Sequence, residues 1–406
     1  MTLVLRRSLI LGMLLAVLAA CGTGATETQN AAAPTATPAS ADNQAQVEAK
    51  LTAAPTATVE ATKEELQVEA FGFAQDKRTV AYVVKIKNPN AAFEISDLKL
   101  EVTGYAKDGS VIATDTRYFS LIYPNQILPM AGDLYLDSDS AVADRIEIEL
   151  TEGTYAASTS KPLPSFTTEK VTYLNDGYRA KVTGIVPNPY STQVDSLWMT
   201  AIAYDEAGAI IGGGWTTLGF IPANGIAAVM VPVVTQGTPA KIELHGAFSR
   251  EYDLSVTTDK TGAEPISIIA EGYSQSQADR LDYGLIVKNP NPAIAYDNSL
   301  YQVAVYAEDG SVLGVAEGSL RGLLPDQELG YGGNVFIPEG ATVGNVVMQV
   351  FADRPREIDP LSGFTFENTT VTTNEYSTVA TGSINSPYTT EIKGIYVSAV
   401  TFDDSG

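Results

Sequence analysis

Short alternations of apolar and polar residues run through the chain from about residue 66, and no stretch shows the spacing of an amphipathic helix. In TVAYVVKIKN (79–88), one face of the expected strand holds Val80, Tyr82, Val84 and Ile86, and the other holds Ala81, Val83, Lys85 and Lys87. Gly, Asn, Asp and Pro separate such runs. The pattern predicts an all-β protein with antiparallel strands.

Four landmarks recur in the same order about every 100 residues. The first is an Asn-Pro pair after a strand-like run: Asn88 and Pro89, Asn188 and Pro189, Asn289 and Pro290. An aromatic residue and an acidic turn ending in glycine follow, as in GYAKDGSVI, AYDEAGAII and VYAEDGSVL. An apolar-Pro turn and a closing strand complete each unit. The three closing strands are RIEIEL, KIELHG and NVVMQV. The sequence therefore contains tandem repeats.

Each repeat offers about seven strand segments and no helical stretch, which predicts tandem Ig-like or fibronectin-like antiparallel β-sandwiches. The expected sandwiches span 65–160, 161–258 and 259–361, with an incomplete fourth over 362–406. In that fourth unit Asn385 stands at the Asn-Pro position, and the sequence stops at the acidic turn. Truncation is the favoured explanation; the alternatives are a poorly ordered segment and one that completes another domain.

The repeated turn residues have a mechanical explanation. Proline lacks the N–H needed to continue a sheet ladder, so Pro89, Pro189 and Pro290 are expected to end their strands, and the preceding asparagines to bond the backbone. Two acidic turns read Asp108-Gly109 and Asp309-Gly310, which we expect to supply the positive φ of a tight hairpin. These residues are predicted to be structural.

The first 21 residues have the pattern of a secretory signal: Arg6 and Arg7, then an apolar run from Leu9 to Ala20. Leu18, Ala19, Ala20 and Cys21 resemble the lipobox of bacterial lipoproteins, which implies that Cys21 becomes an acylated N-terminus. An ordinary secretory signal with an incidental cysteine is the alternative. Residues 22–64 are rich in Ala, Thr and Pro and predict a disordered tether. We expect an extracytoplasmic protein, anchored by lipid to a bacterial membrane at the cell surface or in the periplasm.

The order of landmarks, best seen in VPNPYSTQVDSLWMTAIAYDEAGAIIGGG, resembles the FxLYD domain of bacterial lipoproteins and surface proteins. It is also similar to the water-stress (WHy) domain, whose motif begins with Asn-Pro. The resemblance covers three repeats and part of a fourth. Both families imply a small β-sandwich and no catalytic residues.

The net charge and the numbers of histidine and cysteine limit which partners and which kinds of site can be expected. The chain has 25 basic and 48 acidic residues, a net charge of -23, which disfavours nucleic acid and anionic headgroups as partners. His245 is the single histidine, in a predicted strand, and Cys21 the single cysteine, so no Cys/His metal site or disulfide is expected. The aspartates of GDLYLDSDSAVAD suit a solvated strand end or, alternatively, a weak calcium site. We predict no catalytic residue, cofactor or metal.

Aromatic residues between the acidic turn and the closing strand are the remaining candidates for ligand contact, chiefly Tyr118, Trp215 and Tyr331. Core packing is the alternative role. The sequence therefore predicts a non-enzymatic surface protein whose sandwiches serve as a spacer and an interaction or adhesion module. The alternative is a lipoprotein that binds a carbohydrate or polymer of the envelope; an enzyme without a recognisable motif is a third. The expected partners are the membrane, through Cys21, and an envelope protein or glycan.

Overall fold

The computed structural model describes residues 62–151, 153–158, 166–175, 179–248, 262–352, 355–358, 363–374 and 378–402. The described residues are all-β, with 66% of them in strands and no helix. Accordingly, no helix capable of spanning a membrane occurs in these ranges. The predicted fold class is confirmed.

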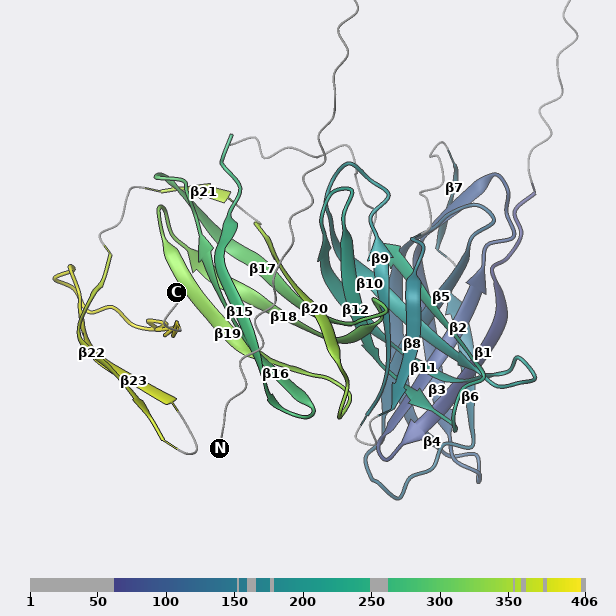
Figure 1. Cartoon of the computed structure of the whole chain (residues 1–406). Coiled ribbons are helices and arrows are strands. Elements are labelled where there is room, and N and C mark those ends of the chain that lie inside the picture. Colours follow the sequence, from purple (N-terminus) through teal and green to yellow (C-terminus); the bar gives the residue numbers. More distant parts are fainter. Residues whose placement is uncertain are drawn as a thin grey trace, which may run out of the picture. The chain divides into compact units, whose positions relative to one another are not determined.

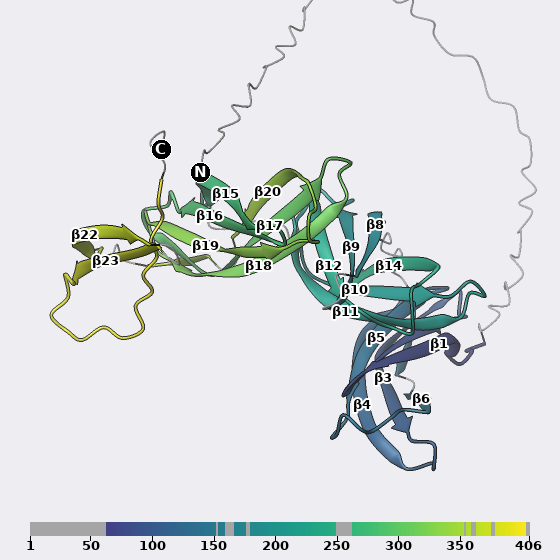
Figure 2. The same ribbon diagram turned by 60° about the horizontal axis from the view of Figure 1, so that its bottom comes forward.

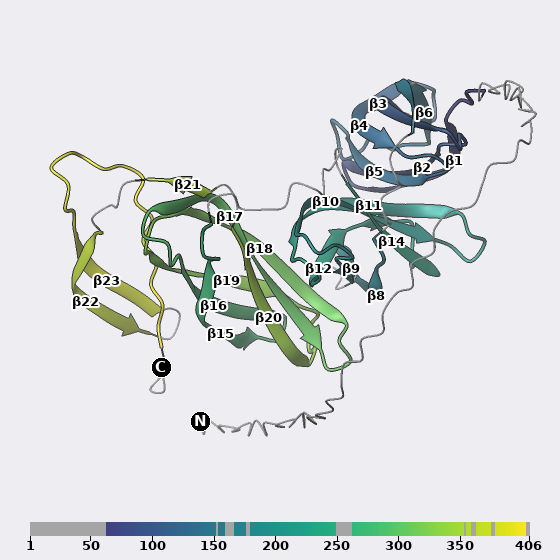
Figure 3. The same ribbon diagram turned by 90° about the horizontal axis from the view of Figure 1, so that it is seen from above.

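The first sandwich consists of two antiparallel sheets, visible as separate layers in Figure 3. One sheet has the order β1-β2-β5, with β1 Gln67–Asp76, β2 Thr79–Lys87 and β5 Ile127–Tyr135. The other has the order β4-β3-β6, with β3 Phe93–Tyr105, β4 Val111–Ile122, β6 Arg145–Thr151, and β7 Thr154–Ala157 beside the start of β3. We call the sheet centred on the strand before Asn-Pro the Asn-Pro sheet, and the sheet centred on the next strand the long-strand sheet.

The same arrangement recurs twice. In the second sandwich the Asn-Pro sheet is built from β8 Glu169–Asn175, β9 Ala180–Pro187 and β12 Ile226–Pro232. Its long-strand sheet is built from β10 Val194–Tyr204, β11 Ile210–Ile221, β13 Val234–Thr235 and β14 Lys241–Phe248.

In the third sandwich, green in Figure 1, the Asn-Pro sheet is built from β15 Ser267–Gln277, β16 Arg280–Lys288 and β19 Glu328–Phe336. Its long-strand sheet is built from β17 Ile294–Ala307, β18 Val312–Leu323, β20 Val343–Phe351 and β21 Pro355–Glu357. Beyond it, β22 Thr365–Thr373 and β23 Thr378–Asn385 form a two-stranded hairpin, yellow in Figure 2.

Each sandwich has its own apolar core between its two sheets. The predicted inward face of β2 is confirmed, since Val80, Tyr82, Val84 and Ile86 are fully buried in the first core. The opposite face of β2 is not a solvent face throughout, because Ala81 and Val83 are also buried.

The Asn-Pro asparagines are buried and join the two sheets of each sandwich. The Asn88 amide nitrogen donates hydrogen bonds to the carbonyls of Phe93 (2.9 Å), at the start of β3, and of Tyr123 (3.0 Å), just after β4. Its side-chain oxygen accepts the N–H of Asn90 at 3.0 Å. One side chain therefore fixes the end of one sheet against both ends of a hairpin in the other.

The second and third sandwiches repeat this corner. The Asn188 amide donates to the carbonyls of Thr192 (2.8 Å) and Pro222 (2.9 Å). The Asn289 amide donates to those of Ile294 (2.7 Å) and Leu324 (2.8 Å). The interaction is thus a property of the repeat.

In each acidic turn the glycine and the aspartate have different roles. Gly109 and Gly310 have positive φ angles of 84° and 79°, a conformation that glycine adopts without strain. The Asp108 carboxylate accepts the N–H of Ser110 at 3.0 Å, and that of Asp309 accepts the N–H of Ser311 at 2.9 Å.

Removal of one corner amide is predicted to destabilise its own sandwich. Asn188→Ala leaves the partly buried carbonyls of Thr192 and Pro222 without this donor, which costs about 2 kcal/mol. Both tryptophans, Trp198 and Trp215, lie in the second sandwich, so urea unfolding followed by tryptophan fluorescence reports on it. The control is Glu206→Ala, an exposed turn residue, expected to change stability by less than about 0.5 kcal/mol. If the two variants unfolded at the same urea concentration, Asn188 would not stabilise the second sandwich and the prediction would be wrong.

Candidate binding cleft between the first and second sandwiches

The first two sandwiches meet through sheet faces. Val83 and Ala131, on the outer face of the first Asn-Pro sheet, form an apolar cluster with Ile202 and Tyr204 of β10. Gly213 of β11 lies so close to β2 that an added Cβ would be 2.5 Å from Val83 Cγ2. The GGG sequence at 212–214 lies inside β11 and allows this close approach. Ile211, beside it, has no partner residue on β10 and marks a bulge in this ladder.

A pair of stacked indoles forms the rim of this contact. The rings of Trp198 and Trp215 are 4.7 Å apart at 15°. The Arg117 guanidinium, from β4 of the first sandwich, lies 4.9 Å from the Trp215 ring centroid and is held by Asp115 at 2.7 Å. This cation therefore links the first sandwich to the indole pair of the second.

Asp133 adds a second link across the same contact. Its carboxylate, on β5, accepts the indole N–H of Trp215 at 3.0 Å. Burial raises the pKa of the Asp133 carboxyl, and the opposing influences of this hydrogen bond and of the charges of Arg117 and Arg179 do not fully offset it. The bond fixes the orientation of Trp215, with its ring at the border of an open cleft.

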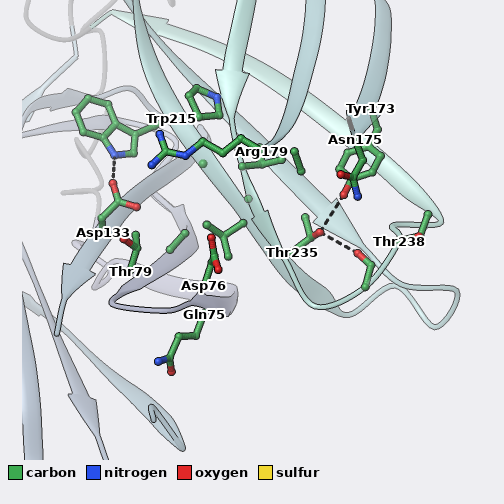
Figure 4. Close-up of a pocket in the computed structure, with 18 of the residues that line it drawn as sticks. Gln75, Asp76, Thr79, Asp133, Tyr173, Asn175, Arg179, Trp215, Thr235 and Thr238 are labelled. Atoms are coloured by element: carbon green, nitrogen blue, oxygen red, sulfur yellow. Dashed lines mark hydrogen bonds between the residues drawn. The ribbon is translucent and has the colours of Figure 1, made fainter. Parts of the chain in front are cut away.

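The cleft has a volume of about 640 Å³ and is lined from both sandwiches. Figure 4 shows Asp76 and Asp133 on one side, Tyr173 and Asn175 on the other, and Arg179 reaching toward Trp215 and Asp133. Tyr135, also on the lining, is 71% exposed. Aromatic surfaces beside carboxylate, amide and guanidinium groups suit a polar ligand with flat apolar faces.

The three candidate aromatics are not brought together. Trp215 lines the cleft. Tyr118 lies on β4 and is 75% exposed. Tyr331 lies on β19 of the third sandwich, its ring 5.7 Å from that of Tyr301, and burial raises its pKa to about 12.

Two arginines near Trp215 were not among the sequence candidates: Arg117, beside the indole pair, and Arg179, on the cleft lining. They come from two repeats and follow no local motif. Asp133 was considered only within the acidic stretch GDLYLDSDSAVAD. The available signal was the apolar character of both faces of β2, where Ala81 and Val83 alternate with the core residues. A strand that is apolar on both faces indicates a second covering layer.

The described residues contain no group of three or more His, Cys, Asp and Glu side chains suited to hold a metal. Asp133, in the acidic stretch considered for calcium, is instead bonded to Trp215, and Asp139 lies 3.9 Å from Arg78. His245 lies in strand β14, as predicted, with its ring nitrogen 3.1 Å from Glu243. Leu18, Ala19, Ala20 and Cys21 lie outside the described residues, as does most of the 22–64 segment.

No family model matches the chain, and no curated protein matches it. Among solved structures, the crystal structure of dimeric latent PorU from Porphyromonas gingivalis matches with a TM-score of 0.14 and 9% sequence identity. The match covers 79% of this chain and 33% of that one, so the chain spans about a third of the length of PorU. At this TM-score the match carries no argument about fold or function.

Loss of Arg117 is predicted to loosen the contact between the sandwiches. Arg117→Ala removes the cation from the indole pair, so the tryptophan emission should move to longer wavelength and the fluorescence-detected transition should weaken by about 1 kcal/mol. Lys99→Ala is the control, because Lys99 is paired with Glu101 at 2.8 Å on the other sheet face of the first sandwich. An identical emission spectrum in the Arg117 variant would contradict the link.

Proposed function

We propose that the protein is a non-enzymatic, lipid-anchored surface protein whose tandem sandwiches act as a spacer and present an interaction or adhesion surface. The observation that supports this most is the construction of the junctions. The second and third sandwiches meet at a second junction. There the buried side chain of Gln302, on β17, accepts the N–H of Ala228 at 3.2 Å and donates to its carbonyl at 3.1 Å. Thr183 adds a bond to the carbonyl of Val312 at 2.9 Å. Buried, hydrogen-bonded junctions suit a spacer whose neighbouring sandwiches must keep their arrangement under mechanical force.

The signal-like N-terminus supports the location. A lipobox-like Leu18-Ala19-Ala20-Cys21 after an apolar run, followed by a Pro- and Thr-rich segment, is the order expected of a tethered lipoprotein. The resemblance to the FxLYD domain of bacterial lipoproteins and surface proteins points the same way. We place the protein outside the cytoplasm, with an envelope protein or glycan as its partner.

The anchor is tested by Cys21→Ser. Acylation of a serine at this position is not expected, so the variant should be released from membranes or accumulate as an unprocessed precursor. Fractionation with metabolic labelling by a fatty acid measures both. Ser8→Ala, inside the signal segment, is the matched control and should remain labelled. Unchanged membrane association of the Cys21 variant would refute the anchor.

The cleft favours a second candidate function, the binding of an envelope carbohydrate. Tyr135 and Trp215 offer faces for sugar rings, while Asp76, Asn175 and Arg179 offer polar groups to hydroxyls. The acidic net charge of -23 makes a neutral polysaccharide a better ligand than a strongly anionic one.

Tyr135→Ala tests this candidate. The side chain is 71% exposed, so folding should be retained while one stacking surface is lost and affinity falls about three- to tenfold. Titration with soluble neutral envelope oligosaccharides, followed by tryptophan fluorescence, measures the change. Phe336→Ala is the control, because Phe336 opposes Arg280 in the third sandwich as Tyr135 opposes Thr79 in the first. Equal binding by the two variants, or no binding by the unaltered protein, would exclude the cleft.

A further inference from the structure

The Asn-Pro sheets of the first two sandwiches receive the next sandwich at the same position. The position is defined by the residue three places before each Asn-Pro asparagine and by its partner on the neighbouring strand. These pairs are Lys85 with Pro129, Ile185 with Ala228, and Ile286 with Gly330. Pro129 and Ala228 both contact the following sandwich through their backbone. Gly330 is therefore the equivalent receiving position of the third sandwich.

The long-strand sheets dock with equivalent residues. Each aromatic residue four positions before the turn glycine marks the register: Tyr204 before Gly208, Tyr306 before Gly310 and Phe402 before Gly406. Four residues before that aromatic, Thr200 donates to the carbonyl of Pro129 at 3.4 Å, and Gln302 bonds Ala228. In the last segment Ser398 occupies this position, and Val400 corresponds to Ile202 and Ala304.

The last segment lies where this equivalence requires. A Cβ built on Gly330 would be 2.4 Å from Val400 Cγ2 and 3.4 Å from Ser398 Oγ. Ile202 and Ala304, the counterparts of Val400, are both buried in the apolar clusters of the two earlier junctions. Ser398 and Val400 therefore contact Gly330 in the register in which β10 and β17 contact Pro129 and Ala228.

The receiving face of the third sandwich is only partly covered. A groove of about 630 Å³ remains between Ala399–Phe402 and the strands β15, β16 and β19. Its floor includes Gly272, Gly284 and Gly332, and no atom lies within 4 Å of a Cβ built on Gly272. A face of small residues leaves room for the side chains of a second layer.

We propose that the outer face of the β15-β16-β19 sheet is a docking surface for the long-strand sheet of a fourth sandwich of the same repeat type. Residues 396–402 of this chain, which lie outside any strand of the described structure, supply the first segment of that sheet. The contact repeats the first two junctions, with Ser398 and Val400 in the positions of Thr200 and Ile202.

A second copy of the chain is a poorer occupant. Its unused long-strand sheet is that of the first sandwich, where Glu101 stands at the position of Thr200 and directly opposite Glu149. Lys99 pairs with Glu101 at 2.8 Å on the same face. The described residues that line the groove include Glu271 and Asp282 and no basic residue, so burying these charges against it would remove their hydration without supplying an opposite charge.

Disulfide trapping in the full chain tests the register. In a Cys21→Ser background, Gly330→Cys with Val400→Cys should oxidise to an intramolecular disulfide, because a Cβ at Gly330 lies 3.8 Å from Val400 Cβ, near the mean Cβ separation of disulfides. Gly272→Cys with Val400→Cys is the matched control on the same face. The first pair should cross-link about tenfold more readily than the control in native buffer. In urea this preference should vanish, which shows that both pairs are reactive.

Intact mass and non-reducing electrophoresis distinguish the outcomes. An intramolecular disulfide specific to the first pair supports the proposal. Equal yields for the two pairs in native buffer, or no cross-link in the first pair while the circular dichroism remains that of a β-protein, overturn it. A disulfide-linked dimer as the main product also overturns it, because the occupant would then be a second copy. The single variants, Gly330→Cys and Val400→Cys, establish that each substitution alone preserves the fold.

Discussion

The buried asparagine at the end of β2, β9 and β16 is the interaction on which each sandwich depends. The following proline cannot donate to the ladder, so the chain leaves the sheet there, beside the partly buried carbonyls of Phe93 and Tyr123 from the other sheet's hairpin. An asparagine amide supplies two donors and an acceptor to this corner. An aspartate would bring a charge and no donors, and an alanine would leave the carbonyls without this partner. The same side chain therefore ends a strand and joins the two layers.

The fold could be predicted because its signals are local and repeated. The alternation in β2 predicted the buried face of Val80, Tyr82, Val84 and Ile86, and the Asn-Pro spacing indicated repeating sheet units. The hydrogen-bond partners of Asn88 could not be predicted, because Phe93 and Tyr123 are brought to it by the fold and not by a motif. The positive φ of the acidic turns belongs to Gly109 and Gly310, while the aspartates act through their carboxylates.

The cleft was beyond sequence reasoning for the same physical reason. Trp215 was a candidate as an aromatic residue, but its orientation is set by Asp133, 82 positions away in another repeat. Arg117 completes the contact from a third strand, β4. Such a site is assembled by the packing of two sandwiches, and no single repeat contains it. The apolar outer face of β2 was the one feature of the sequence that indicated a partner layer at this place.

The junctions are directional, because an Asn-Pro sheet receives and a long-strand sheet docks. Contacts of this head-to-tail kind are heterologous and do not close on themselves, so they propagate unless one face is unsuited to docking. The residues at the Thr200 position supply that distinction. Thr200 and Gln302 are neutral hydrogen-bonding residues buried at the junctions, whereas Glu101 of the first sandwich is a carboxylate opposite a second carboxylate. Desolvation of this pair disfavours docking by the first sandwich, while the glycines of β16 and β19 leave the opposite face of the series open to another layer. One position in the repeat thus determines which faces associate and which remain in water.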